Sequence, residues 1–217
     1  MKAHFTKRRL IAAIVLLAVL LVSIAGLYMH EANRQLSAEQ IDALREKYPL
    51  CGHIPPLVSM RFYTMAEVME DNDTFVYGTV EGEMSVYSKY ISTGNPELDK
   101  KRQENGIADV YDFYSYTISV IEDTEGIYQA GDKIRIESNT VFIDFNPHLF
   151  DGMKIVIPVA GYSRPDGVTG FSAEGMYYVT EDGYVLSVID EAMMMMEEPL
   201  SGVKLEKLLK ALKKQMQ

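Results

Sequence analysis

The side chains best suited to chemistry are the single cysteine and the histidines. Cys51 and His53 are separated by one residue and could form a thiol–imidazole pair or half of a metal site. A zinc ion needs a second pair of ligands, and His30 and His148 lie far away in the sequence. A Gly-x-Ser-x-Gly elbow would suggest a Ser-His-Asp hydrolase, but the sequence contains no such motif. We therefore interpret Cys51 and His53 as ordinary loop residues and predict no catalytic residue.

Two acidic clusters could bind calcium, namely Asp71-Asn72-Asp73 and Glu197-Glu198. Calcium loops have alternating carboxylates, a central glycine and a late glutamate, and neither cluster has that pattern. Both clusters are expected to be solvated turns. The sequence thus predicts no metal ligand, no cofactor-binding residue and no cofactor.

Two further features could form binding surfaces. Fourteen tyrosines suggest a sugar-binding face, but the chain has no tryptophan and the tyrosines alternate along strands as core residues do. The four consecutive methionines from Met193 to Met196 could form an adaptable apolar contact surface, because thioether side chains are flexible. Core filling after the last strand is the other interpretation, for at least two of the four.

The cellular address depends on the apolar run that begins at Leu10 and ends at Tyr28, which contains no charged residue. At about 1.5 Å per residue, a helix of this length covers roughly the 30 Å hydrocarbon core of a bilayer. Lys7, Arg8 and Arg9 precede the run, so the positive-inside rule keeps the N-terminus in the cytoplasm. We expect a cytoplasmic tail at 1–9, a transmembrane anchor at 10–28, a juxtamembrane helix and linker at 29–59, and an extracytoplasmic domain at 60–217.

The alternative for the same run is a cleaved signal peptide, with Ser23 and Ala25 as the small residues of the cleavage site. The run continues past that site to Tyr28 and exceeds a usual h-region of about 7–15 residues, which favours an uncleaved anchor. No cysteine lies near Ala25, so a lipid anchor is excluded. Both interpretations export the domain, and the cleaved form would be secreted.

Charge and cysteine content limit the partners of that domain. The net charge is −10; residues 1–28 and 201–217 contribute +4 each, so residues 29–200 carry −18. Such a surface repels phosphates, so we expect no nucleic-acid partner. The lone Cys51 allows no internal disulfide, which suggests a bacterium whose envelope proteins do not rely on disulfides.

Helical patterns flank the domain. Ser37 and Gln40 form a capping box before a predicted helix over 38–47, which could be a stalk or could pack on the domain. Thr64 caps a short helix over 65–70. A final helix, capped by Ser201, carries a leucine stripe opposite its lysines and is predicted to pack on its own domain.

Between the helices the sequence has the period of strands. Alternation or β-branched residues predict strands over 74–80, 84–90, 112–122, 133–137, 141–145, 153–160, 176–180 and 184–188. Gly78 marks a bulge or a close backbone approach, Pro158 indicates a strand end or edge, and Asp182-Gly183 predicts a hairpin. The segment from Ser92 to Asp109 is predicted to be a long surface loop, and 161–170 is also assigned to a loop.

Short connections between these strands favour a barrel over a parallel α/β sheet. The motifs that follow the first short helix are Gly78-Thr79-Val80, Tyr116-Thr117-Ile118-Ser119-Val120, Gly131-Asp132-Lys133-Ile134, Gly152 before an apolar strand, and Tyr177-Tyr178-Val179-Thr180-Glu181-Asp182-Gly183. Over about residues 60–212 this order resembles the OB-like β-barrel domains of poorly characterised, membrane-anchored extracytoplasmic proteins of Gram-positive bacteria. The expected fold is mainly β: a small OB-like closed or partly open barrel with flanking short helices, preceded by one transmembrane helix.

These observations predict a non-enzymatic binding or adaptor module of the bacterial cell envelope. Its partners would be the lipid bilayer, through Leu10 to Tyr28, and an envelope protein or a cell-wall ligand. The alternative function is an envelope enzyme or redox protein that uses Cys51 and a histidine. Comparing Cys51→Ser with the parent in thiol reactivity and activity would separate the two.

Overall fold

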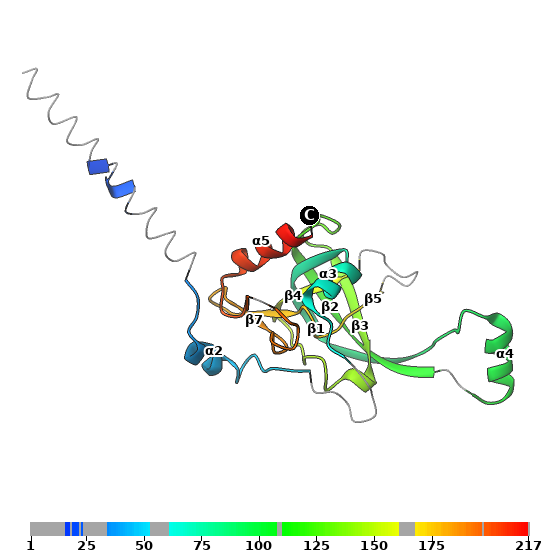
Figure 1. The fold of residues 1–217 in the computed structure, drawn as a ribbon. Coiled ribbons are helices and arrows are strands. Elements are labelled where there is room, and N and C mark those ends of the chain that lie inside the picture. The colour runs from blue at the N-terminus through cyan, green and yellow to red at the C-terminus, as the bar shows by residue number, and fades with distance from the viewer. Residues whose placement is uncertain are drawn as a thin grey trace, which may run out of the picture. The chain divides into compact units, whose positions relative to one another are not determined.

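The computed structural model describes residues 16–17, 19–21, 23, 34–52, 61–107, 110–160, 168–196 and 198–216 (Figure 1). The chain divides into two compact units, Met1–Gln35 and Leu36–Gln217. In the first unit, the residues described between 16 and 23 are helical and exposed. The rest of the predicted anchor at 10–28 lies outside the described residues. Within the part of the chain that is described, no helix combines the length and apolar character that crossing a membrane requires.

The second unit begins with α2, Ala38–Leu44, which has the predicted Ser37–Gln40 capping box. The helix is shorter than predicted, because residues 45–47 form a turn. It packs on its own unit: the Leu36 N–H donates to the Gly202 carbonyl at 2.9 Å, and Ile41 contacts the core. The compact unit therefore starts at Leu36, upstream of the boundary expected at residue 60.

One seven-stranded sheet forms the centre of this unit, in the order β5-β3-β2-β1-β4-β6-β7. Its strands are β1 Thr74–Tyr90, β2 Val110–Asp123, β3 Lys133–Asn139, β4 Lys154–Val159, β5 Val168–Gly170, β6 Tyr177–Val179 and β7 Val185–Ser187. Neighbours are antiparallel except β3 and β5, which are parallel.

The sheet is open. Among the described residues, β5 and β7 each pair with a single neighbour, and each has three residues. No ladder joins these two edges, so the closed form of the predicted barrel is wrong, whereas the mainly β fold is confirmed.

Gly78 allows β1 to contact β2 closely. The register of the two strands shifts between Tyr77 and Gly78. A Cβ at position 78 would lie 2.5 Å from Ile118 Cγ2 and 2.7 Å from the Ser119 carbonyl oxygen. Both consequences expected of this glycine, a bulge and a close backbone approach, are confirmed.

Pro158 lies near the end of β4, as predicted, but β4 is an inner strand of the sheet. The Val159 carbonyl accepts from the Asp73 N–H beside β1, so the nitrogen of Pro158 points to the opposite side of the strand. On that side β6 pairs with β4 only from Lys154 to Val156. The missing N–H therefore interrupts no ladder.

Two segments depart from the strand and loop assignments. The alternating residues 141–145 form a turn with a 3₁₀ helix, Thr140–Phe142, because the Asn139 side chain accepts from the Val141 N–H and starts the turn. Residues 168–170, expected in a loop, form β5. The predicted hairpin is confirmed: β6 and β7 are antiparallel, and Gly183 has φ of 74°.

Strands β1 and β2 continue beyond the sheet as a two-stranded arm that ends in α4, Pro96–Glu104 (Figure 1). β4 follows β1 only as far as Thr79, and β3 follows β2 only from Phe113 to Ser119. The predicted surface loop is exposed as expected, but this helix, capped by Asn95, occupies its centre. None of the helical residues is buried, so no apolar stripe marked the helix in the sequence.

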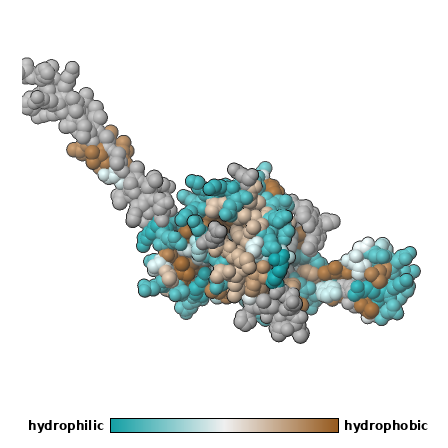
Figure 2. All heavy atoms as spheres, viewed as in Figure 1, coloured by the Kyte–Doolittle hydropathy of each residue, from teal (hydrophilic) through white to brown (hydrophobic). Residues whose placement is uncertain are grey.

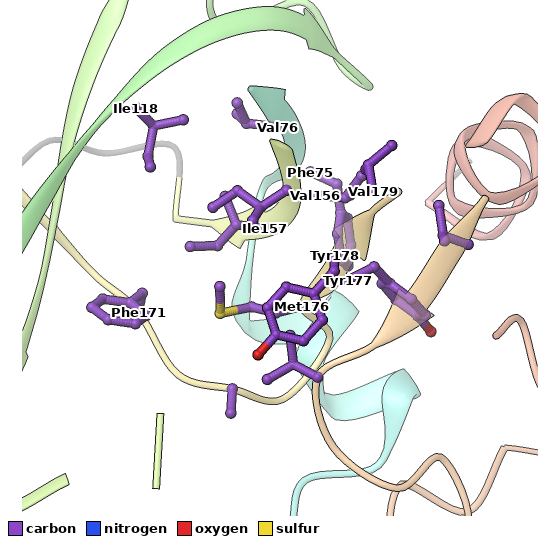
Figure 3. Close-up of a cluster of buried hydrophobic side chains, with 14 of the residues drawn as sticks. Phe75, Val76, Ile118, Val156, Ile157, Phe171, Met176, Tyr177, Tyr178 and Val179 are labelled. Atoms are coloured by element: carbon purple, nitrogen blue, oxygen red, sulfur yellow. The ribbon is translucent and has the colours of Figure 1, made fainter. Parts of the chain in front are cut away.

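The core lies between the sheet and the elements that cover it. Figure 3 shows Phe75 and Val76 of β1, Ile118 of β2, Val156 and Ile157 of β4, and Met176 to Val179 converging in one cluster. Besides α2, two other helices pack against this core: α3, Met65–Asp71, which has the predicted cap at Thr64, and α5, Leu205–Gln215.

The final helix packs on its own unit, as predicted, through three buried leucines: Leu208, Leu209 and Leu212. The predicted N-cap is wrong, because α5 begins after Lys204. Ser201 instead accepts a hydrogen bond from the Ser187 N–H at 2.9 Å. Lys213 pairs with Glu122 of β2 at 2.9 Å, so a lysine of the helix contacts the acidic body.

Candidate functional site

Among the residues that the structure describes, the side chain of Cys51 contacts a tyrosine and no histidine. Its thiol is 3.7 Å from the Tyr178 hydroxyl, and its backbone N–H donates to the Val188 carbonyl. Burial raises the pKa of the Cys51 thiol, which disfavours the thiolate that a nucleophile or redox centre needs. His53 and His30 lie outside the described residues, and His148 is exposed. The pairing of Cys51 with His53 stays untested.

The acidic clusters do not form a metal site in the part of the chain that is described. Asp71 ends α3, and Asn72 and Asp73 lead into β1. Glu197 lies outside the described residues, and Glu198 is exposed. No group of three or more His, Cys, Asp or Glu side chains among the described residues could hold an ion.

A groove of about 910 Å³ lies where α3, the turn around the methionine run, and α5 meet. In the space-filling view a hydrophobic patch lies in the region between α5 and α3, with hydrophilic residues around it (Figure 2). The groove is lined by five methionines, Met65, Met69, Met195, Met196 and Met216. We call it the methionine groove.

Buried polar contacts hold the turn that carries the methionine run. Glu191 is 7% exposed and accepts hydrogen bonds from the backbone N–H groups of Leu200 and Ser201. The Tyr177 hydroxyl donates to the same carboxylate at 3.3 Å. Met194 is fully buried, and its carbonyl accepts from the Met65 N–H of α3. These contacts attach the turn to the core and to α3.

The same turn exposes Met195. This residue is 78% exposed and has φ of 52°, in the left-handed region that methionine rarely adopts. The conformation costs about 1 kcal/mol or more, so the surrounding contacts must impose it. Core filling is confirmed for Met194, and Met196 is partly buried against the core. Met193 and Met195 are exposed, and their role as a contact surface stays a prediction.

Three carboxylates border the methionine groove on two of its sides. Glu70 and Asp73 border it beside α3, and Glu198 borders it beside the methionine run. Among the described lining residues there is no lysine, arginine or histidine. The groove therefore offers flexible apolar contacts within a negative field.

A second, smaller pocket lies on the other side of α3. It has a volume of about 280 Å³ and contains the side chain of Glu174, which is 3% exposed. Sequence analysis gave no indication of this residue, because one glutamate between β5 and β6 follows no recognisable motif.

No protein-family model, curated protein or solved structure matches this chain.

Proposed function

We propose that this protein is a membrane-anchored extracytoplasmic binding module of the bacterial cell envelope. Residues 10–28 would hold it in the bilayer, with 1–9 in the cytoplasm and the unit Leu36–Gln217 outside. The observation that carries the binding role is the methionine groove, a large concave surface with five methionines, built from three separate elements.

The methionine groove suits an amphipathic helix of a partner protein whose flanking residues are Lys or Arg. Methionine side chains adapt to apolar side chains of different shape, and helices bind grooves through their apolar face. Glu70, Asp73 and Glu198 complement basic flanks, which favours a cationic over an anionic partner. An envelope protein is therefore the favoured partner, ahead of a neutral cell-wall glycan.

The OB-like assignment and the Gram-positive origin belong to the same proposal. A partly open five-stranded barrel is the architecture of OB-like domains. The pairing of β1 with both β2 and β4, and of β5 in parallel with β3, supports such an arrangement for β1 to β5. Strands β6 and β7 then extend it beyond β4.

The binding role can be tested with synthetic peptides on the full chain in nanodiscs of zwitterionic lipid. We expect a leucine–lysine amphipathic peptide to bind and its leucine–glutamate counterpart not to bind. Burial of one methionine contributes roughly 1.5–3 kcal/mol, so Met195→Asn should weaken binding by about tenfold or more. Asparagine tolerates the left-handed backbone, so the fold is retained.

Val141→Asn is the matched control, because Val141 is 53% exposed and does not line the methionine groove. Equal loss of affinity in both variants, or equal affinity for both peptides, would refute the role of the groove. The topology is tested separately with a cysteine at Ile127, which is 45% exposed, in a Cys51→Ser background. We expect a membrane-impermeant reagent to label this cysteine on intact cells. Labelling only after lysis would refute the extracytoplasmic location of the unit.

A further inference from the structure

The small pocket beside α3 combines aromatic, apolar and acidic side chains. Tyr63 and Phe171 provide aromatic surface, and Val68 and Pro158 provide aliphatic surface. The polar groups are those of Asp71, Asn72, Ser172 and Glu174. A volume of about 280 Å³ is near the lower end of the range for small-molecule sites, so it suits a small ligand or one end of a larger one.

Glu174 is the most unusual group in this pocket. Its side chain lies in the turn before β6 and is almost fully buried. The Ser172 hydroxyl donates to Oε2, whereas Oε1 is buried and has no hydrogen-bond partner among the described residues. Burial raises the pKa of Glu174, and the backbone N–H groups of Glu174 and Tyr63 oppose the rise only in part.

A buried carboxylate oxygen without a donor destabilises a fold, and native proteins keep few such groups. The described residues that line the pocket supply no cation. Arg61, two residues before the lining residue Tyr63, pairs with Glu67 at 2.8 Å and lies over the Tyr63 ring. No Lys, Arg or His lines the pocket among the described residues, while Asp71 adds a second negative charge.

We propose that this pocket binds the ammonium group of a small alkylammonium ligand. Because Oε1 of Glu174 has almost no accessible surface, the side chain turns toward the pocket, where the ammonium donates to Oε1. Asp71 attracts the ammonium, and the alkyl stem packs on Val68, Pro158 and Phe171. A charge-assisted hydrogen bond is about twice as strong as a neutral one, and aromatic faces add a cation–π attraction. A neutral ligand of the same shape gains neither contribution.

The probe is n-butylammonium, with n-butanol as its neutral counterpart. Both are titrated against the full chain in lipid nanodiscs and followed by saturation-transfer NMR, with empty nanodiscs as reference. We expect saturable binding of n-butylammonium, at least about tenfold weaker in Glu174→Gln because the charge-assisted bond is lost. Asp71→Asn should weaken it severalfold, and Glu70→Gln, which faces the methionine groove, should leave it unchanged.

Binding of n-butanol as tight as that of n-butylammonium would overturn the proposal. So would unchanged affinity in Glu174→Gln, or the absence of saturable binding. If Glu174→Gln does not fold, the n-butylammonium affinities of Asp71→Asn and Glu70→Gln are compared instead. Both residues are exposed, so both variants should fold. Met195→Asn should not alter n-butylammonium binding, so failure here is distinguishable from failure of the methionine groove.

Discussion

Leu208 provides the most direct test of how the final helix is held. It is fully buried, as is Leu212, while Leu209 is 5% exposed, so α5 contributes one continuous apolar face to the core. Leu→Ala changes at such positions cost about 2–5 kcal/mol, the sum of lost transfer energy and a residual cavity. Because no part of Leu208 reaches solvent, we expect about 3 kcal/mol for Leu208→Ala.

The assay is thermal unfolding of the full chain in a mild detergent, followed by circular dichroism. For a domain of this size each 1 kcal/mol lowers Tm by about 2–4 °C, so Leu208→Ala should lower it by about 6–12 °C. Leu208→Asp should lower it further, because it adds an unpaired buried charge. Lys210→Ala is the matched control, since Lys210 is exposed on the same helix and should change the stability by less than about 0.5 kcal/mol.

The packing of α5 would be refuted if Leu208→Ala and Lys210→Ala had the same Tm. That result would mean that the leucine face is free in solution. Loss of vesicle binding in Leu208→Ala without loss of stability would then identify the helix as a membrane contact. Both measurements use the same two variants.

Three further predictions concern single groups in the core and the small pocket. Gly78→Ala should destabilise the fold by about 1–3 kcal/mol, because its Cβ would overlap Ile118; an unchanged denaturant midpoint would contradict the close approach. Burial raises the pKa of Tyr114 to about 12 from an unfolded value of 10.0. The fold thus favours the protonated phenol, and this contribution, roughly 3 kcal/mol, is present below pH 10 and lost between about pH 10 and 12. Alkaline unfolding of Tyr114→Phe should therefore depend less steeply on pH, and equal slopes would exclude the effect. The pKa of Glu174 is also raised above its ordinary value of 4.5. The protonated carboxyl therefore stabilises the fold below pH 4.5, and this stabilisation is lost as the pH rises through the pKa of the folded state. Without ligand, Glu174→Gln should be less sensitive to pH over that interval in chemical denaturation, and an identical pH profile would contradict the shift.

Features set by neighbouring residues could be predicted from the sequence. The capping box at Ser37 and the N-cap at Thr64 depend on residues within three positions, and both form as expected. Glu67 also completes a capping box at Thr64, which was not predicted. The turn at Gly183 depends only on a residue that tolerates positive φ. Such features need no knowledge of the rest of the fold.

Errors arose where one pattern is compatible with two structures. The alternation over 141–145 resembles a strand, but the Asn139 side chain caps a 3₁₀ turn there. Asn95 and Pro96 are favourable N-cap and N1 residues, yet a helix without an apolar stripe has no period to reveal it. Barrel closure depends on whether the two edge strands meet, which is a non-local property.

The candidate sites were predictable only in part, for the same reason. The methionine run is visible in the sequence, but Met65, Met69 and Met216 join it from α3 and from the residue after α5. Only the fold brings these side chains together. Glu174 becomes notable only when its burial and its missing donor are known.

Helix α3 lies between the methionine groove and the small pocket, and Asn72, the residue that follows it, lines both. The packing of α3 determines whether the two sites communicate. Met69 and Glu70 face the groove, whereas Val68 and Asp71 face the pocket. On the pocket side the helix has little freedom, because a Cβ at Gly175 would lie 2.7 Å from Val68 Cγ1.

Adjustment on the groove side can occur in flexible methionine side chains and does not require α3 to move. Conformational coupling between the two sites would require α3 to change its arrangement, so we expect none. Saturating n-butylammonium should therefore leave the affinity of the leucine–lysine peptide unchanged within about twofold. A larger change that persists at high salt would show that α3 itself shifts, since direct repulsion between the two cations would be screened.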